Sequence, residues 1–208
     1  MTDNLFDYND DIASKQSKKK FAQVKKENSS NCSLSKIIVF DIESTGLPGQ
    51  GEIIEIGAIK FNKKGQKYKV IDIYSERIKP QTDYWSSSAA ATHKINKEKL
   101  ENCRTIDLVL KDFLTFLEPD YVVAGHRIGF DCTFIREYCQ KCGYPIPTNK
   151  VIDTYIIATE VLRIDQELAK RYLKKNYDIH LKDLVKYYNV AYTLMNNHRA
   201  YVDSLTTA

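Results

Sequence analysis

A short apolar run with an acid inside it constrains this chain more than any other feature. Residues Ile37–Ile42 (IIVFDI) are rich in β-branched side chains, which predicts a buried strand. A carboxylate at Asp41 is costly there unless it is paired or bound to a metal. Glu43 follows two positions later, and such positions face the same side of a strand. The two carboxylates either bind one hard cation together, such as Mg²⁺ or Mn²⁺, or face solvent at the end of the strand.

The segments that follow predict further strands. Glu52–Phe61 and Tyr68–Ile78 have strand patterns, and a hairpin turn is expected at Asn62–Gly65 between them. Such short connections favour an antiparallel meander of three strands. A fourth, short strand is expected at Tyr121–Ala124.

Helices are expected through most of the second half of the chain. Apolar residues at helical spacing, with stop signals such as Gly143, predict Ile106–Leu117, Phe130–Cys142, Val151–Leu162, Leu181–Tyr188 and a last helix from about Asn197 to Ala208. Pro80–Thr92 shows no period and is expected to be irregular. This order implies an α/β fold in which a mixed sheet, three antiparallel strands and then parallel strands, is flanked by helices.

Composition excludes several protein classes. The chain has 208 residues, 43% hydrophobic and 28% charged, which suits one domain with a tail. No apolar run approaches the roughly 18 residues of a membrane span, and the N-terminus lacks a signal-peptide pattern, so a cytoplasmic protein is expected. Residues 1–36 carry seven lysines and few large apolar residues, which predicts a disordered tail. Residues 37–208 are expected to form the functional domain.

Charge and cysteine content add little about function. The net charge of +4 is too small to identify a nucleic-acid protein. Five cysteines without a secretory signal indicate free thiols in a reducing compartment. Cys139 and Cys142 form a CxxC, but no second pair follows at zinc spacing. We therefore expect them to pack on a helix as small hydrophobic residues.

Three more residues are candidates for chemistry. Asp131 stands between an apolar strand and a helix, where it suits either a helix cap or a metal ligand. His198 and Asp203 are about 140° apart on a continuous helix, so they converge only if His198 lies in the loop or first turn. Otherwise they are a surface histidine and a solvated aspartate.

Taken together, these pieces resemble the DEDDh 3′→5′ exonucleases, the family of ribonuclease T, oligoribonuclease and the proofreading epsilon subunit of bacterial DNA polymerase III. The family's three motifs are matched at Phe40–Gly46 (FDIESTG), Gly129–Asp131 (GFD) and His198–Asp203 (HRAYVD). Two connecting segments, Ala91–Ile95 and Val151–Thr154, also resemble those of the family. The resemblance runs from about Lys36 to Ala208 and implies a ribonuclease H-like fold.

The resemblance also implies hydrolysis of phosphodiester bonds with two divalent ions, Mg²⁺ or Mn²⁺, roughly 3.5–4 Å apart. The implied metal ligands are Asp41, Glu43, Asp131 and Asp203. His198 would be the general base for the attacking water. The expected substrate is a single-stranded or frayed 3′ end of DNA, shortened to nucleoside 5′-monophosphates in proofreading or repair, with a DNA polymerase as partner and no membrane.

Substrate-binding residues are implied beside these motifs: Glu43, Ser44, Thr45, Gly46, Leu47 and His93. The loop after the first strand would meet the terminal sugar, and Leu47 would either wedge against the terminal base or pack. His93 matches a substrate-contacting histidine of the family. Tyr84 and Trp85 either stack on bases or pack under their loop.

Some neighbouring residues carry other expectations. Phe130 is expected in the core, and Asp153 is expected to be structural, as a helix cap. Arg127 departs from the family, because asparagine commonly stands four residues before the second-motif aspartate.

Two other functions share these residues. One is a 3′-end RNA-processing exoribonuclease, and the other is a non-catalytic exonuclease-like module that binds a polymerase or RNA. Only five residues follow Asp203, which is short for the last helix of this motif and suggests part of a longer protein.

Overall fold

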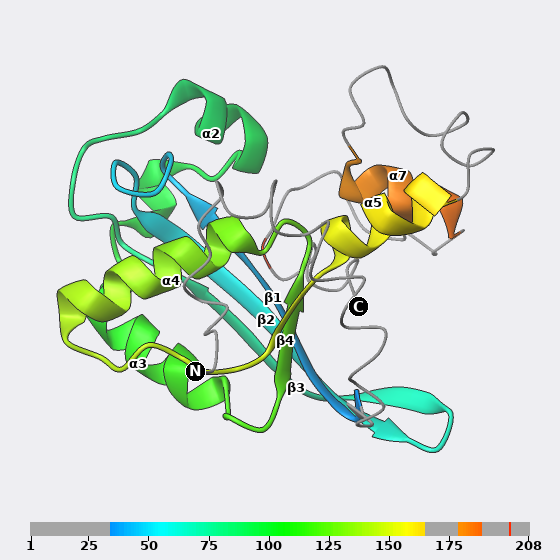
Figure 1. The fold of residues 1–208 in the computed structure, drawn as a ribbon. Coiled ribbons are helices and arrows are strands. Elements are labelled where there is room, and N and C mark those ends of the chain that lie inside the picture. The colour runs from blue at the N-terminus through cyan, green and yellow to red at the C-terminus, as the bar shows by residue number, and fades with distance from the viewer. Residues whose placement is uncertain (1–33, 165–178, 189–199, 201–208) are drawn as a thin grey trace.

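A five-stranded mixed sheet organises the computed structural model, which describes residues 34–164, 179–188 and 200. The strands are β1 (Lys36–Ser44), β2 (Ile53–Lys64), β3 (Lys67–Arg77), β4 (Val122–Gly125) and β5 (Val151–Asp153), in the order β3-β2-β1-β4-β5. The first three are antiparallel neighbours, whereas β4 runs parallel to β1 and β5 runs parallel to β4 (Figure 1). This arrangement confirms the predicted fold class.

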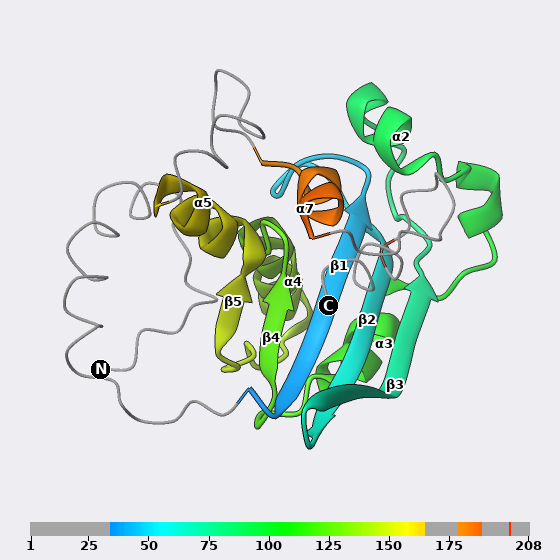
Figure 2. The same ribbon diagram turned by 90° about the vertical axis from the view of Figure 1, so that its right-hand side faces the viewer.

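Helices cover both faces of the sheet. They are α2 (Ser87–His93), the 3₁₀ helix η2 (Lys97–Leu100), α3 (Ile106–Phe116), α4 (Gly129–Cys142), α5 (Thr154–Ile164) and α7 (Leu181–Tyr187). Figure 2 shows α3 and α4 behind the sheet and α7 in front of β1. Within the described parts of the chain, no helix combines the length and hydrophobicity that crossing a bilayer requires.

The core lies between the sheet and α3 and α4. Ile38, Phe40 and Ile42 alternate along β1 and are buried on this side. The Phe40 ring meets Phe113 of α3 edge-on, with centroids 5.3 Å apart. Because side chains alternate across a strand, Asp41 and Glu43 point to the opposite face. The hydrophobic pattern that builds the core therefore also places the two acids together.

Three expected elements differ in the structure. The hairpin expected at Asn62–Gly65 is present, but its turn is shorter, because β2 continues to Lys64 and the chain reverses at Gly65, whose φ is +65°. Pro80–Thr92 is not wholly irregular, since α2 begins at Ser87. Val151–Asp153 is strand β5 rather than the start of a helix. A three-residue apolar segment has no period of its own, so only its pairing with β4 reveals the strand.

Other expectations have mixed outcomes. Cys139 is buried in the core and Cys142 packs against it, as predicted for the CxxC. Phe130 is 39% exposed, so its expected place in the core is wrong. It sits at the start of α4, where its ring contacts only the edge of the helix's own Phe134 among the rings of described residues. The tail before Leu34 and the last helix lie outside the described residues, apart from Ala200.

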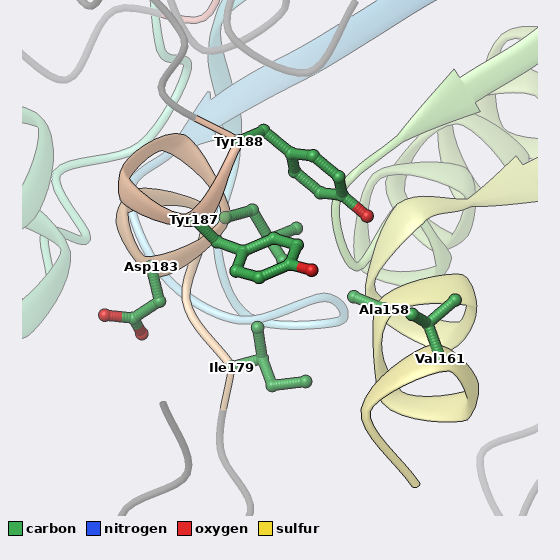
Figure 3. A pocket seen from close by; sticks show the side chains of 7 residues that line it. Ala158, Val161, Ile179, Asp183, Tyr187 and Tyr188 are labelled. Atoms are coloured by element: carbon green, nitrogen blue, oxygen red, sulfur yellow. The ribbon is translucent and has the colours of Figure 1, made fainter. Parts of the chain in front are cut away.

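An apolar pocket lies between α5 and α7 (Figure 3). Its lining includes Ala158 and Val161 from α5, together with Ile179, Leu184 and Tyr188. Ala158 and Ile179 are buried, and Leu184 packs against them. The pocket is therefore where α7 and the residues before it rest on α5.

Candidate active site

The carboxyl ends of the parallel strands β1, β4 and β5 meet at one edge of the sheet, where α/β folds commonly bind ligands. Asp41 and Glu43 lie in the second half of β1, His126 and Arg127 follow β4, and Asp153 ends β5. Residues far apart in the sequence are thereby gathered at a single edge.

Asp41 and Glu43 share the face opposite the core. Asp41 is half-buried and pairs in register with Gly57, whereas Glu43 is only 8% exposed and pairs with Glu55. Buried carboxylates need a hydrogen-bond donor or a cation. Their placement fits the shared face predicted from the sequence.

Asp131 brings a third carboxylate to β1. Its Oδ1 accepts a hydrogen bond from the backbone N–H of Ile42 at 2.9 Å, and Ile42 lies between Asp41 and Glu43. The residue is in the first turn of α4, whose N-cap is Ile128, so Asp131 is not the helix cap. The helix start therefore holds this carboxylate against the strand that bears the other two.

The pKa of Asp131 is raised to about 8, mainly because the carboxyl is buried, and the negative charge of Asp153 contributes to the rise. The Ile42 N–H lowers the pKa, but only in part. A nearby cation would favour the ionised form of the same group. The ionised form of Asp131 would therefore be stabilised by a cation close to its carboxylate.

These oxygens suit a hard divalent cation by their chemistry. In residues 34–164, 179–188 and 200, no three His, Cys, Asp or Glu side chains already form a metal-binding cluster. Two of the expected residues, His198 and Asp203, lie outside the described residues. Ala200 between them is buried, and its N–H donates to Glu55 Oε2 at 3.1 Å.

The end of β1 and the loop from β1 to β2 hold four other expected substrate residues. Ser44 Oγ donates to the Gly46 carbonyl at 2.7 Å, and Thr45 Oγ1 accepts the Glu52 N–H at 2.9 Å. Both side chains are buried and engaged within the loop. Leu47 is 64% exposed and is available for contact. Tyr84 lies against Gly46, so a Cβ at this position would come 2.7 Å from the tyrosine ring.

His93, at the end of α2, is the remaining expected contact. It is 3% exposed, and Nδ1 accepts the Ile95 N–H at 2.9 Å, so Nε2 carries the proton of the neutral ring. Among the described residues, this buried Nε2 has no hydrogen-bond partner. Burial lowers the pKa of His93, whereas Glu55 raises it. Trp85 packs edge-on against the ring, which favours packing over base stacking for Trp85.

Arg127 and Asp153 form one local unit. Arg127 adopts φ 58°, and its N–H donates to Asp153 Oδ1 at 2.9 Å. The same oxygen accepts the Tyr155 N–H at 2.8 Å, which confirms Asp153 as a structural cap at the start of α5. The Arg127 guanidinium lies 4.3 Å from the centroid of the Tyr155 ring. Arg127, which stands where the family usually has asparagine, thus places its guanidinium over an aromatic ring.

Glu55 is the site residue that sequence reasoning overlooked. It is fully buried on β2, and Arg77 Nε lies 3.2 Å from its Oε1. The signal was present in the run Glu52–Phe61, where an acid stands among apolar residues. The cost argument that singled out Asp41 applies equally to Glu55.

Comparison with known proteins decides the family. The profile of the RNase T family, described as exonuclease, matches residues 38–208. This chain belongs to that exonuclease family. A PolC-type DNA polymerase III from Caldanaerobacter subterraneus is 33% identical over 174 residues, which is 83% of this chain and 11% of the relative. The enzyme of the same name from Thermotoga maritima is 38% identical over 128 residues, 61% of this chain and 9% of the relative.

The exonuclease chain therefore spans about a tenth of the length of these curated relatives. Solved structures agree on the fold. Escherichia coli exonuclease I with a dT13 oligonucleotide aligns with a TM-score of 0.66 at 16% identity, covering 83% of this chain and 39% of that one. A 3′-exonuclease that recognises a histone mRNA stem-loop aligns at 0.62 and 16% identity, covering 92% and 67%.

Proposed function

We propose that this exonuclease domain is a metal-dependent 3′→5′ exonuclease of the DEDDh type, releasing nucleoside 5′-monophosphates in DNA proofreading or repair. One observation carries the proposal: the Asp131 carboxylate is hydrogen-bonded to Ile42, between Asp41 and Glu43. The acid of the second motif is thus held against the stretch of β1 that carries the two acids of the first, although the motifs are 88 residues apart at their closest.

The residues have distinct roles in this proposal. Asp41, Glu43, Asp131 and Asp203 hold two Mg²⁺ or Mn²⁺ ions. When bound, such ions supply positive charge to the scissile phosphate and to the leaving oxygen. His198 accepts a proton from the attacking water, which suits an imidazole near neutral pH.

Substrate contacts follow from the loop geometry. Leu47, exposed beside the site, stacks against the terminal base, and the backbone around Gly46 meets the sugar. His93 Nε2–H donates to a substrate oxygen, which satisfies a buried donor that otherwise carries an energetic cost. Glu43, besides binding metal, also contacts the terminal nucleotide.

DNA is favoured over RNA by the relatives. The two polymerases named above are DNA polymerase III enzymes, so a domain acting beside a polymerase is the first choice. The 3′-exonuclease that recognises a histone mRNA stem-loop has the same fold. A 3′-end exoribonuclease is therefore the second candidate function.

Degradation of 5′-labelled single-stranded DNA and RNA tests the proposal. With Mg²⁺ or Mn²⁺ we expect a ladder of products that shorten from the 3′ end, and none with EDTA. His198→Ala and Asp203→Ala should each lower the rate by at least about 100-fold. Asp72→Ala, which removes an exposed acid on β3, is the matched control and should keep the wild-type rate.

Each outcome bears on a separate part of the proposal. A wild-type chain that is inert on both substrates in both metals rules out the enzyme. Internal cuts rather than a ladder rule out exonuclease action. Wild-type rates in Asp203→Ala rule out the ligand assignment.

A further inference from the structure

We infer that Glu55 is a positioning residue that holds the segment carrying His198 and Asp203 in its working place. The inference rests on the exonuclease function proposed above. It assigns a role to a buried carboxylate that none of the three family motifs contains.

Glu55 sits in a place that disfavours an acid. It is fully buried and lies directly opposite Glu43 in the β1–β2 register. Side chains of directly opposed residues lie on the same face about 4.5–5.5 Å apart, and like charges there are destabilising. Such a residue requires specific partners to be tolerated.

Both oxygens of Glu55 have partners. Oε1 accepts from Arg77 Nε at 3.2 Å, and Arg77 is its register neighbour on β3. Oε2 accepts from the Ala200 N–H at 3.1 Å. Arg77 balances the charge and orients the carboxylate, so that the second oxygen faces the backbone of Ala200. With its oxygens engaged in this way, Glu55 serves as an anchor rather than as a metal ligand.

The anchored atom lies between two proposed site residues. Ala200 is two residues after His198 and three before Asp203. Ala200 is itself buried, so the hydrogen bond is shielded from water. Because Glu43 and Glu55 are register partners, this one bond ties the third motif to the strand pair that carries the first. Errors of about 1 Å at such positions reduce catalysis strongly.

Glu55→Gln in the full chain tests the inference. Glutamine keeps the shape but has one acceptor where the carboxylate has two, so either Arg77 or the Ala200 N–H faces an amide NH₂. We expect kcat to fall about 10–100-fold and the half-saturating Mn²⁺ concentration to rise about 10-fold, as for other residues that orient ligands. KM for DNA should stay within about three-fold, since the substrate loop is not altered.

A second measurement does not depend on catalysis. Hydrogen exchange of the Ala200 amide, followed by NMR, should accelerate at least about 10-fold in Glu55→Gln. Amides of α3 serve as the internal reference and should keep their wild-type rates.

Glu118→Gln is the matched control. It removes the negative charge paired with Lys60, a buried residue five positions along β2, where Nζ and Oε1 are 2.6 Å apart. It should lower the melting temperature and leave kcat, metal dependence and Ala200 exchange unchanged. A general loss of stability is thereby separated from loss of positioning.

The outcomes are distinct. Wild-type kinetics and Ala200 exchange in Glu55→Gln overturn the inference and leave the proposed function standing. An inactive wild type overturns the function, while Ala200 exchange still decides whether Glu55 anchors the segment. If Glu55→Gln does not fold, Arg77→Gln replaces it: faster Ala200 exchange with lower kcat supports the inference, and wild-type values overturn it.

Discussion

Asp131 shows at the scale of one residue how stability and activity can oppose each other. Its carboxyl is 4% exposed and fixed on the Ile42 N–H, in surroundings that favour the protonated form. In the metal-free protein, the folded state holds this proton to a higher pH than the unfolded chain does. Its contribution to stability is therefore complete at low pH and is lost as pH rises through the folded pKa of about 8.

Asp131→Asn should separate the two effects. Asparagine can still accept the Ile42 N–H but carries no charge. In EDTA at about pH 9 we expect the variant to be more stable than wild type by at least about 1 kcal/mol, since one pKa unit is worth that much. Nuclease activity should fall at least about 100-fold. Thermal or denaturant unfolding and the labelled-DNA assay measure the two effects.

The same variant gives a pH test with a defined sign. At about pH 5, Asp131 is protonated in the metal-free protein, so the stability advantage of Asp131→Asn should disappear. An advantage of equal size at both pH values would contradict the assignment of the charge to Asp131.

At the scale of elements, the β1–β2 loop directly follows the acids of β1 and is tightly built. The Gly51 N–H donates to the Leu47 carbonyl at 2.7 Å. A Cβ on Gly51 would lie 2.5 Å from the backbone nitrogen of Gly46. Backbone cannot rotate away as a side chain can, so only glycine fits there.

Gly51→Ala should therefore cost about 2 kcal/mol or more in unfolding free energy and lower kcat/KM, because the shifted loop carries Leu47 and Gly46. Gly49→Ala is the control. Gly49 has φ +78° but open space around its Cα, so alanine costs only the left-handed conformation, about 1–2 kcal/mol. Its kcat/KM should stay within about two-fold of wild type. Equal losses of kcat/KM in the two variants would show that the effect does not come from the contact between Gly51 and the Gly46 backbone.

Helices and strands were predictable from the sequence where their pattern of apolar residues extended over many residues. The alternation along Tyr68–Ile78 and the helical spacing of Ile106–Leu117 correspond closely to β3 and α3. Strand β5 (Val151–Asp153) was not predictable in this way, because three residues are too few to show a period. The segment is recognised as a strand only by its pairing with β4. The start of α2 at Ser87 was likewise missed, although Ser86 is a residue type that commonly caps helices.

At the scale of the whole molecule, net charge is a poor guide and its placement is what matters. Residues 1–36 hold seven lysines and five acids, which leaves 24 basic and 22 acidic residues in 37–208. Both parts are thus only +2. Two divalent ions would bring the domain to about +6, with the added charge where a phosphate binds.

Affinity for single-stranded DNA should therefore depend on metal more than on the tail. With the His198→Ala variant, which keeps the substrate intact, replacing Mg²⁺ by EDTA should weaken binding at least about 10-fold. Changing Lys15, Lys18, Lys19, Lys20, Lys25 and Lys26 to glutamine should weaken it less than about three-fold. Fluorescence anisotropy measures both. A larger loss from the lysine changes would assign binding to the tail.

The shared face of Asp41 and Glu43 on a buried strand was predictable from the residues alone, because alternation is a local property of strands. The chain order of elements likewise determined a mixed α/β fold. The contacts of Asp131 with Ile42, 89 residues away, and of Glu55 with Ala200, 145 residues away, became visible only in the folded chain. Local periodicity sets which way a side chain faces, whereas strand pairing and helix packing set which distant backbone atom it meets.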